Sequence, residues 1–280
     1  MLIQLTLLFS YYMSTLSITL IQSSLHWLDK PANLAMFEQK INAIRERTEI
    51  IVLPEMFSTG FSMEPALMAE TMEGTTVAWM KRVAAEKKVI LTGSIIIEEQ
   101  GHYYNRLVWM QPNGVYGVYD KRHRFAYAGE DKEYTAGSKR LIASVKGWKI
   151  HLLVCYDLRF PVWARQSPSA ATNDGDSHEY DVLIYVANWP EKRSHAWKTL
   201  LQARAIENQV YVVGANRTGD DGNNIHYSGD SMVVDPLGGI LYTKSQEEDV
   251  FTISLQKEKL DEVRNSFPFW RDADEFSIFP

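Results

Sequence analysis

The run KIHLLVCYD, residues 149–157, is apolar for most of its length and breaks off at Cys155 into the polar pair Tyr-Asp. A short, nearly continuous run of Val, Ile and Leu predicts a strand buried on both faces. Further runs of this kind recur along the chain, at residues 17–22, 49–55, 88–97, 181–189 and 210–217. We therefore expect a core that is built largely from buried strands.

Helical patterns separate these runs, at residues 31–47, 75–88 and 194–209. Alternating strands and helices are typical of an α/β fold. Residues 103–121 and 231–244 instead read as hairpins, because turn sequences (Pro-Asn-Gly and Asp-Pro-Leu-Gly-Gly) divide each into two strand-like halves. Hairpins within an α/β chain predict mixed sheets rather than purely parallel ones.

The composition and net charge of the chain restrict the kinds of partner that it can bind. The chain has 280 residues, of which 45% are hydrophobic and 23% charged, enough for a large core and unlike a disordered protein. Its net charge of -6 gives nucleic acid or an anionic membrane surface little to bind. We therefore expect a small-molecule partner, with no nucleic acid and no membrane. The absence of a linker or repeat predicts one domain over residues 1–280.

The single cysteine cannot form an intrachain disulfide, which favours a reducing compartment such as the cytoplasm. Residues 1–22 are apolar, but they lack the positive start of a signal peptide and contain Gln, Ser and Thr, which also argue against a membrane span. We expect residues 1–14 to be an N-terminal extension, with Met13 as an alternative start. The polar run 166–180 is predicted to be a surface insertion.

Reactive side chains follow three of the predicted strands: Glu55, Lys121 and Cys155. Open α/β sheets bind ligands at the carboxyl ends of their strands. A helix start is predicted at Pro161, and a helix N-terminus close to Cys155 would stabilise its thiolate. Taken singly, each residue also has a structural interpretation: Cys155 as a buried apolar thiol, Glu55 as a carboxylate that caps a helix or loop, and Lys121 as part of a solvated basic turn.

His151, Cys155 and Asp157 are candidate metal ligands, because they fall within seven residues and lie on one face if the strand continues. No CxxC, HExxH or second histidine pair accompanies them, and zinc needs three or four converging ligands. We therefore expect no metal and no cofactor.

Three motifs in order carry a family pattern: LPEMF at 53–57, YDKRHRF at 119–125 and VCYDLRFP at 154–161. They resemble the glutamate, lysine and cysteine motifs of the nitrilase superfamily of carbon-nitrogen hydrolases. Four later stretches are similar to its omega-amidase branch: residues 186–197, 201–217, 226–238 and 267–276. The resemblance runs from about residue 15 to the end.

The resemblance implies an α/β fold, a four-layer αββα sandwich of two mixed sheets flanked by helices, and a homodimer. It also implies that Cys155 is the nucleophile, Glu55 the general base and Lys121 their electrostatic partner. A second glutamate commonly follows the lysine, and Glu130 is the better candidate than Glu133. An amide attacked by a thiolate forms an oxyanion, which Lys121 and the backbone N–H of Tyr156 are expected to stabilise.

The omega-amidase branch implies hydrolysis of the terminal amide of 2-oxoglutaramate, 2-oxosuccinamate or succinamate. Such substrates carry a carboxylate, for which arginine is suited. We favour Arg193; Arg159 is interpreted as an ion-pair partner that holds its turn, and Lys192 as solvated.

Phe61 and Trp189 are expected to line the pocket, whereas Phe57, Phe125 and Trp197 are left as candidate wall or core residues. Two alternatives stay open: another amidase of the superfamily, such as one for N-carbamoyl amines or nitriles, and a catalytically silent binding protein.

Overall fold

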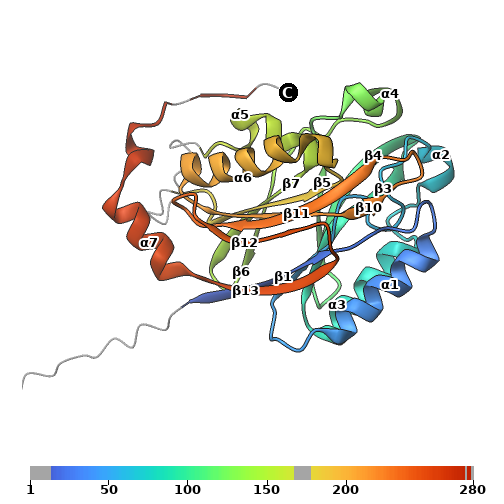
Figure 1. The fold of residues 1–280 in the computed structure, drawn as a ribbon, viewed down its shortest axis with the longest axis horizontal. Coiled ribbons are helices and arrows are strands. Elements are labelled where there is room, and N and C mark those ends of the chain that lie inside the picture. The colour runs from blue at the N-terminus through green and yellow to red at the C-terminus, as the bar shows by residue number, and fades with distance from the viewer. Residues whose placement is uncertain (1–13, 167–177, 275, 279–280) are drawn as a thin grey trace, which may run out of the picture.

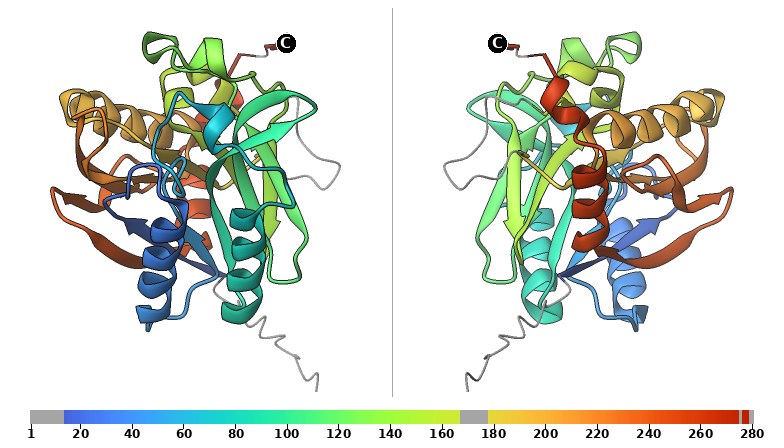
Figure 2. Two further views of the ribbon diagram at one scale, coloured as in Figure 1. Left: turned by 90° about the vertical axis from the view of Figure 1, so that its right-hand side faces the viewer. Right: turned by 90° about the vertical axis from the view of Figure 1, so that its left-hand side faces the viewer.

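The computed structural model describes residues 14–166, 178–274 and 276–278. Within these residues two mixed sheets pack face to face, and helices cover the outer face of each (Figure 1). Figure 2 shows the same layers from two sides, with α1 and α3 against one sheet and α6 against the other. The predicted four-layer αββα sandwich is confirmed.

The described part of the first sheet has six strands in the order β13-β1-β2-β3-β4-β5. Strands β1, β2 and β3 run parallel, whereas the remaining neighbours are antiparallel. The bounds are β1 Thr15–Gln22, β2 Ile50–Val52, β3 Ile90–Glu99, β4 His102–Met110, β5 Tyr116–Asp120 and β13 Asp249–Gln256. The predicted hairpin over residues 103–121 is β4 and β5.

Among the described residues the second sheet has seven strands, in the order β10-β11-β9-β8-β7-β6 with β12 paired to β11. Its parallel centre is β7, β8 and β9. The bounds are β6 Leu141–Val145, β7 Trp148–Val154, β8 Val182–Ala187, β9 Tyr211–Asn216, β10 Thr218–Asp220, β11 His226–Val234 and β12 Ile240–Ser245. The mixed character of both sheets follows from their hairpins.

Side chains alternate between two buried layers along the strands of the first sheet. On β4, Leu107 and Trp109 face the core shared with the second sheet, whereas Val108 and Met110 face the core under the helices. Successive strand residues point to opposite faces, so a strand with both faces covered must be apolar throughout. This packing is the physical reason for the near-continuous apolar runs of the sequence.

The helices begin and end where local chemistry permits. Helix α1, Lys30–Ala43, begins with Pro31 in its first turn and with Asp29 accepting a hydrogen bond from Ala32 N at 3.0 Å. Helices α3 and α6 both end at a residue with left-handed backbone. The remaining bounds are α2 Pro65–Met68, α3 Thr75–Lys87, α4 Glu130–Glu133, α5 Pro161–Ala164, α6 Ser194–Asn208 and α7 Lys257–Ser266, and the 3₁₀ helices are η1 Ala126–Ala128, η2 Cys155–Arg159, η4 Glu191–Arg193 and η5 Phe269–Asp272.

Two predicted segments fall mainly outside the described residues. The predicted extension 1–14 lies there except for Ser14, and β1 begins at Thr15. Of the predicted surface insertion 166–180, residues 167–177 lie outside the description. Its end is not a surface segment, because Tyr180 is fully buried beside β8. No helix within the described ranges is long and apolar enough to cross a membrane.

Candidate active site

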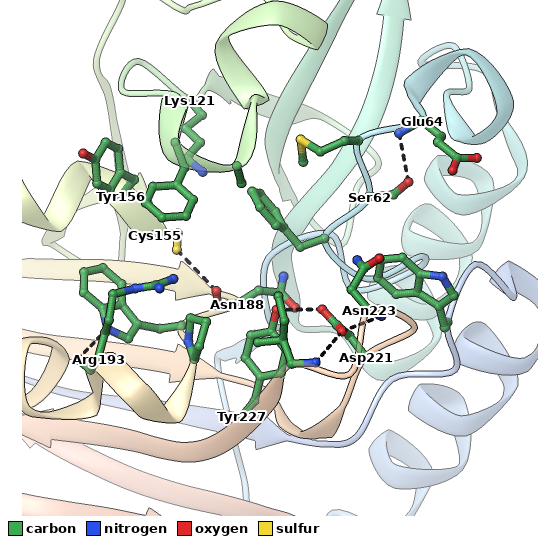
Figure 3. Close-up of a pocket in the computed structure, with 18 of the residues that line it drawn as sticks. Ser62, Glu64, Lys121, Cys155, Tyr156, Asn188, Arg193, Asp221, Asn223 and Tyr227 are labelled. Carbon is green, nitrogen blue, oxygen red and sulfur yellow. Dashed lines mark hydrogen bonds between the residues drawn. The ribbon is translucent and has the colours of Figure 1, made fainter.

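Three chain segments meet at one end of the two sheets. Lys121 directly follows β5 and Cys155 directly follows β7, as predicted. Glu55 was expected at the end of its strand, but β2 ends at Val52 and Glu55 lies three residues beyond it. The next residue, Met56, has a left-handed backbone with φ of 43°. Figure 3 shows Lys121 and Cys155 converging from different elements.

Lys121 makes contact with two buried glutamates. Its Nζ lies 2.9 Å from Glu55 Oε1, and 3.0 and 2.8 Å from the two carboxylate oxygens of Glu130. The exposed fraction is 1% for the lysine side chain and 0% for each glutamate. Burial works to lower the pKa of Lys121, but the carboxylates of Glu130 and Glu55 outweigh it and raise that pKa, so the ammonium stays charged.

The carboxylates have further donors. Asn105 Nδ2 lies 2.8 Å from Glu55 Oε1 and 3.1 Å from Glu130 Oε1, and the backbone N–H of Asn188 donates to Glu55 Oε2 at 2.8 Å. Burial raises the pKa of Glu130, the charge of Lys121 lowers it and the Glu55 carboxylate raises it, with a net rise. The alternative Glu133 is exposed. The geometry thus joins Glu130, not Glu133, to this cluster.

Cys155 is the first residue of η2 and has a left-handed backbone with φ of 42°. Non-glycine residues in this region are strained and concentrate at functional sites. Its Sγ lies 3.9 Å from the carbonyl oxygen of Asn188. Burial raises the pKa of the thiol, and so do the Glu55 carboxylate beside it and a hydrogen bond to that group, whereas Lys121 lowers it. The thiol therefore needs a base to lose its proton at neutral pH.

The turn after Cys155 is held by Asp157. This buried carboxylate accepts hydrogen bonds from Val154 N at 3.0 Å, Tyr119 Oη at 2.7 Å and His123 N at 3.0 Å. The predicted helix start at Pro161 is confirmed, but the 3₁₀ helix η2 comes first and places its own N-terminus at the cysteine.

The three candidate metal ligands, His151, Cys155 and Asp157, do not converge. Strand β7 ends at Val154, so alternation does not carry from His151 to Asp157. The His151 ring is fully buried and packs 5.1 Å from the ring of Tyr180, and burial lowers its pKa. Across the described ranges no group of three or more His, Cys, Asp or Glu side chains is arranged to hold a metal ion.

A cavity of about 320 Å³ opens onto Cys155 and Lys121. The sequence-predicted residues Phe61, Tyr156, Trp189 and Arg193 line it, and so does Phe125. The remaining lining residues are Trp27, Ser62, Met63, Glu64, Ala128, Arg159, Asn188, Pro190, Asp221, Asn223, Ile225 and Tyr227. The other two aromatic candidates, Phe57 and Trp197, are fully buried in the core.

Two arginines face this cavity. The guanidinium carbon of Arg193 lies 5.0 Å from the ring centroid of Phe125, and that of Arg159 lies 4.9 Å from the ring centroid of Trp189. Arg159 was expected to hold its turn through an ion pair. In the described part of the chain neither guanidinium has a carboxylate within ion-pair distance, so Asp157, not an arginine ion pair, holds the turn.

Sequence reasoning missed Asn105, Asn188 and the wall from Asp221 to Tyr227. Asn188 carried a usable signal, because it directly follows the buried run of β8. Its side chain donates to the carbonyl oxygen of Glu55 at 2.6 Å, which fixes the turn that bears this glutamate. Asn105 lies within a strand, where a buried amide has no distinguishing pattern in the sequence.

The chain is similar in sequence and in fold to known proteins. A family model described as carbon-nitrogen hydrolase matches residues 17–265. The omega-amidase YafV of Escherichia coli strain K12 is 44% identical over 95% of this chain and 100% of its own length, and a 2-oxoglutaramate amidase of Bacillus subtilis is 32% identical over 87% and 92%. The crystal structure of XC1258 from Xanthomonas campestris, a CN-hydrolase superfamily protein with an arsenic adduct in its active site, has a TM-score of 0.92 and 41% identity over 95% of this chain and 100% of that one.

Proposed function

The chain belongs to the carbon-nitrogen hydrolase family, and we propose that it is an omega-amidase that releases ammonia from short dicarboxylate monoamides such as 2-oxoglutaramate, 2-oxosuccinamate and succinamate. One observation carries the proposal. The cavity that holds the Cys155 thiol beside Glu55 and Lys121 also holds two guanidinium groups, Arg159 and Arg193, that pair with no carboxylate in the described residues.

The acylation step begins at Cys155. Glu55, whose carboxylate lies beside the thiol, takes its proton as Sγ attacks the amide carbon. The resulting tetrahedral intermediate breaks its carbon-nitrogen bond, and Glu55 passes the proton to the departing nitrogen, which leaves as ammonia. A thioester between Cys155 and the acyl group remains.

Deacylation reuses the same base. Glu55 takes a proton from a water molecule, whose oxygen attacks the thioester carbon, and the proton returns to Sγ as the carbon-sulfur bond breaks. The products are the free dicarboxylate and the original thiol. Because one carboxylate serves both steps, its hydrogen bonds to Asn105 and Asn188 must hold it in reach of the thiol throughout.

The oxyanion of each step needs donors that are already in place. The Lys121 ammonium is buried beside Cys155 and stays charged, and the N–H of Tyr156 lies at the start of η2, where helix N–H groups have no partner within the helix. Removing one such donor costs about 3 kcal/mol of transition-state stabilisation. We assign the oxyanion to these two groups.

Recognition of the substrate carboxylate falls to Arg193 and Arg159. Each guanidinium lies near an aromatic ring, which restrains it and leaves its N–H groups for a ligand. Figure 3 shows Arg193 on the Cys155 side of the cavity, away from Glu64. A dicarboxylate monoamide would thus present its carboxylate to the arginines and its amide to the thiol.

Replacing Arg193 with Met should raise KM for succinamate by about 10- to 100-fold, because a charge-assisted hydrogen bond contributes about 1.5–3 kcal/mol. The Arg159→Met variant is expected to act in the same direction. KM for an uncharged amide such as butyramide should change little, which steady-state ammonia release measures. The matched control is Lys192→Met, since Lys192 is the exposed neighbour of Arg193. Equal effects on charged and uncharged amides would contradict a carboxylate role.

The proposal is tested directly by ammonia release from a panel of amides, N-carbamoyl amines and nitriles. We expect the highest kcat/KM for monoamides that carry a terminal carboxylate. Carbon dioxide released together with ammonia would instead favour an N-carbamoyl amine amidohydrolase. We further propose a cytoplasmic homodimer, which the lone cysteine and the family resemblance support.

A further inference from the structure

We propose that Asn105 is a positioning residue: it holds Glu55 and Glu130 in place while Lys121 turns one of its N–H groups toward the oxyanion. The inference rests on the proposed function, since it assigns a task within the same reaction. Two carboxylate oxygens, Glu55 Oε1 and Glu130 Oε1, lie within hydrogen-bond distance of both Lys121 Nζ and Asn105 Nδ2.

The pairing of β4 with β5 brings Asn105 to Lys121. Arg106 lies opposite Asp120 in this antiparallel pair, and Lys121 N donates to the carbonyl oxygen of Asn105 at 3.0 Å. The side chain of Asn105 is 1% exposed. Residue 105 therefore fixes the backbone of the lysine, and its amide lies beside the lysine's ammonium.

The donors of Lys121 are fully used in this arrangement. An ammonium has three N–H groups, and three carboxylate contacts at 2.8–3.0 Å account for them. To donate to an oxyanion, Lys121 must give up or share one contact. Glu55 Oε1 and Glu130 Oε1 would then depend on the Asn105 amide, which is not among the residues that line the cavity.

The orientation of the Asn105 amide follows from its neighbours. Ionised carboxylates only accept hydrogen bonds, so the NH₂ group must face Glu55 and Glu130. This leaves Asn105 Oδ1 buried without a partner in the described residues. An unpaired buried oxygen is unfavourable, and an apolar residue of this shape would avoid it. The two N–H donors are therefore the feature that an asparagine supplies here.

Asn105→Leu, which keeps the shape and removes the donors, should lower kcat for 2-oxoglutaramate by about 100-fold with KM within about threefold. The acid limb of kcat/KM should move up by about one pH unit, because carboxylates that lose a donor bind a proton more readily. In Asn105→Ala a water molecule can enter, so the loss should be smaller. The Ala variant also keeps the test valid if the Leu variant does not fold.

Asn208→Leu is the matched control, because Asn208 is also a buried asparagine, 4% exposed, and it hydrogen-bonds Arg204 O within α6. Its effect should be limited to thermal stability. A folded Asn105 variant with an unchanged acid limb, or with the loss confined to KM, would overturn the inference.

A second readout needs no substrate. Cys155 is the only cysteine of the chain, so alkylation by iodoacetamide followed by mass spectrometry reports on this thiol alone. The pH midpoint of alkylation should rise in both Asn105 variants. Without the Asn105 N–H donors, the negative charge of the carboxylates beside Cys155 is less well stabilised, and this charge disfavours the thiolate. If the wild type released no ammonia from any monoamide, the proposed function would fail, while an unshifted alkylation midpoint would separately refute the role of Asn105.

Discussion

Replacing Cys155 with Ala should lower ammonia release from 2-oxoglutaramate or succinamate by about 10⁴-fold or more, because no other group can form the thioester. The fold should persist. Alanine adopts the left-handed backbone of this position at a cost similar to that of cysteine, and the loss of one sulfur from the core interface is a small change. Steady-state assays and thermal unfolding measure the two effects.

Two observations would separate this outcome from misfolding. The Cys155→Ala variant should show the far-UV circular dichroism of the wild type, and it should gain no mass with iodoacetamide. In Cys155→Ser the hydroxyl oxygen occupies the position of the sulfur, but it is a much poorer nucleophile at neutral pH. Activity should therefore remain close to that of the Ala variant. Full activity in either variant would refute the thioester mechanism.

The strands and main helices were predictable from sequence because burial on two faces leaves an unmistakable pattern. All six predicted apolar runs contain strands, and the helices predicted over 31–47, 75–88 and 194–209 correspond to α1, α3 and α6. Boundaries were less accurate. Leu53 continues the apolar run of β2, and its N–H still donates to Thr92 O of β3 at 2.7 Å, but the strand ends at Val52 because Pro54, which has no N–H, follows.

The residues that hold the site were largely invisible to sequence reasoning. The exceptions are Lys121 and Cys155, which directly follow strands, and Glu55, which lies three residues beyond one; in each case a polar or reactive side chain interrupts an apolar run. Asn105 becomes meaningful only through its register with β5, and register is a property of paired strands. The role of Arg159 likewise depends on tertiary contacts. Its sequence position suggests a structural ion pair, but the nearby carboxylate, Asp157, accepts hydrogen bonds from Val154 N and Tyr119 Oη instead. Such contacts depend on tertiary structure.

Lys121→Met should lower kcat/KM by about 10³-fold or more and destabilise the protein by about 3–5 kcal/mol at pH 7.5, because it leaves two buried carboxylates without their cation. The destabilisation should shrink as the pH falls. The pKa of Glu130 is already raised by burial, and Lys121 is the group that lowers it, so the pKa rises further without the lysine. A carboxyl whose pKa is raised in the folded state binds a proton more tightly there, so folding gains stability as the pH drops through that value.

Urea unfolding at pH 7.5 and pH 5.5 measures this dependence, with Lys132→Met as the control because Lys132 is an exposed lysine of α4. The control should change the free energy of unfolding by less than about 0.5 kcal/mol at both pH values. Adding Glu130→Gln to Lys121→Met should restore part of the stability, since one unpaired charge is removed, but should not restore activity. Equal destabilisation at both pH values would mean that Lys121 stabilises the fold by packing alone; a pH-dependent loss identifies its charge as what allows two carboxylates to be buried beside the thiol.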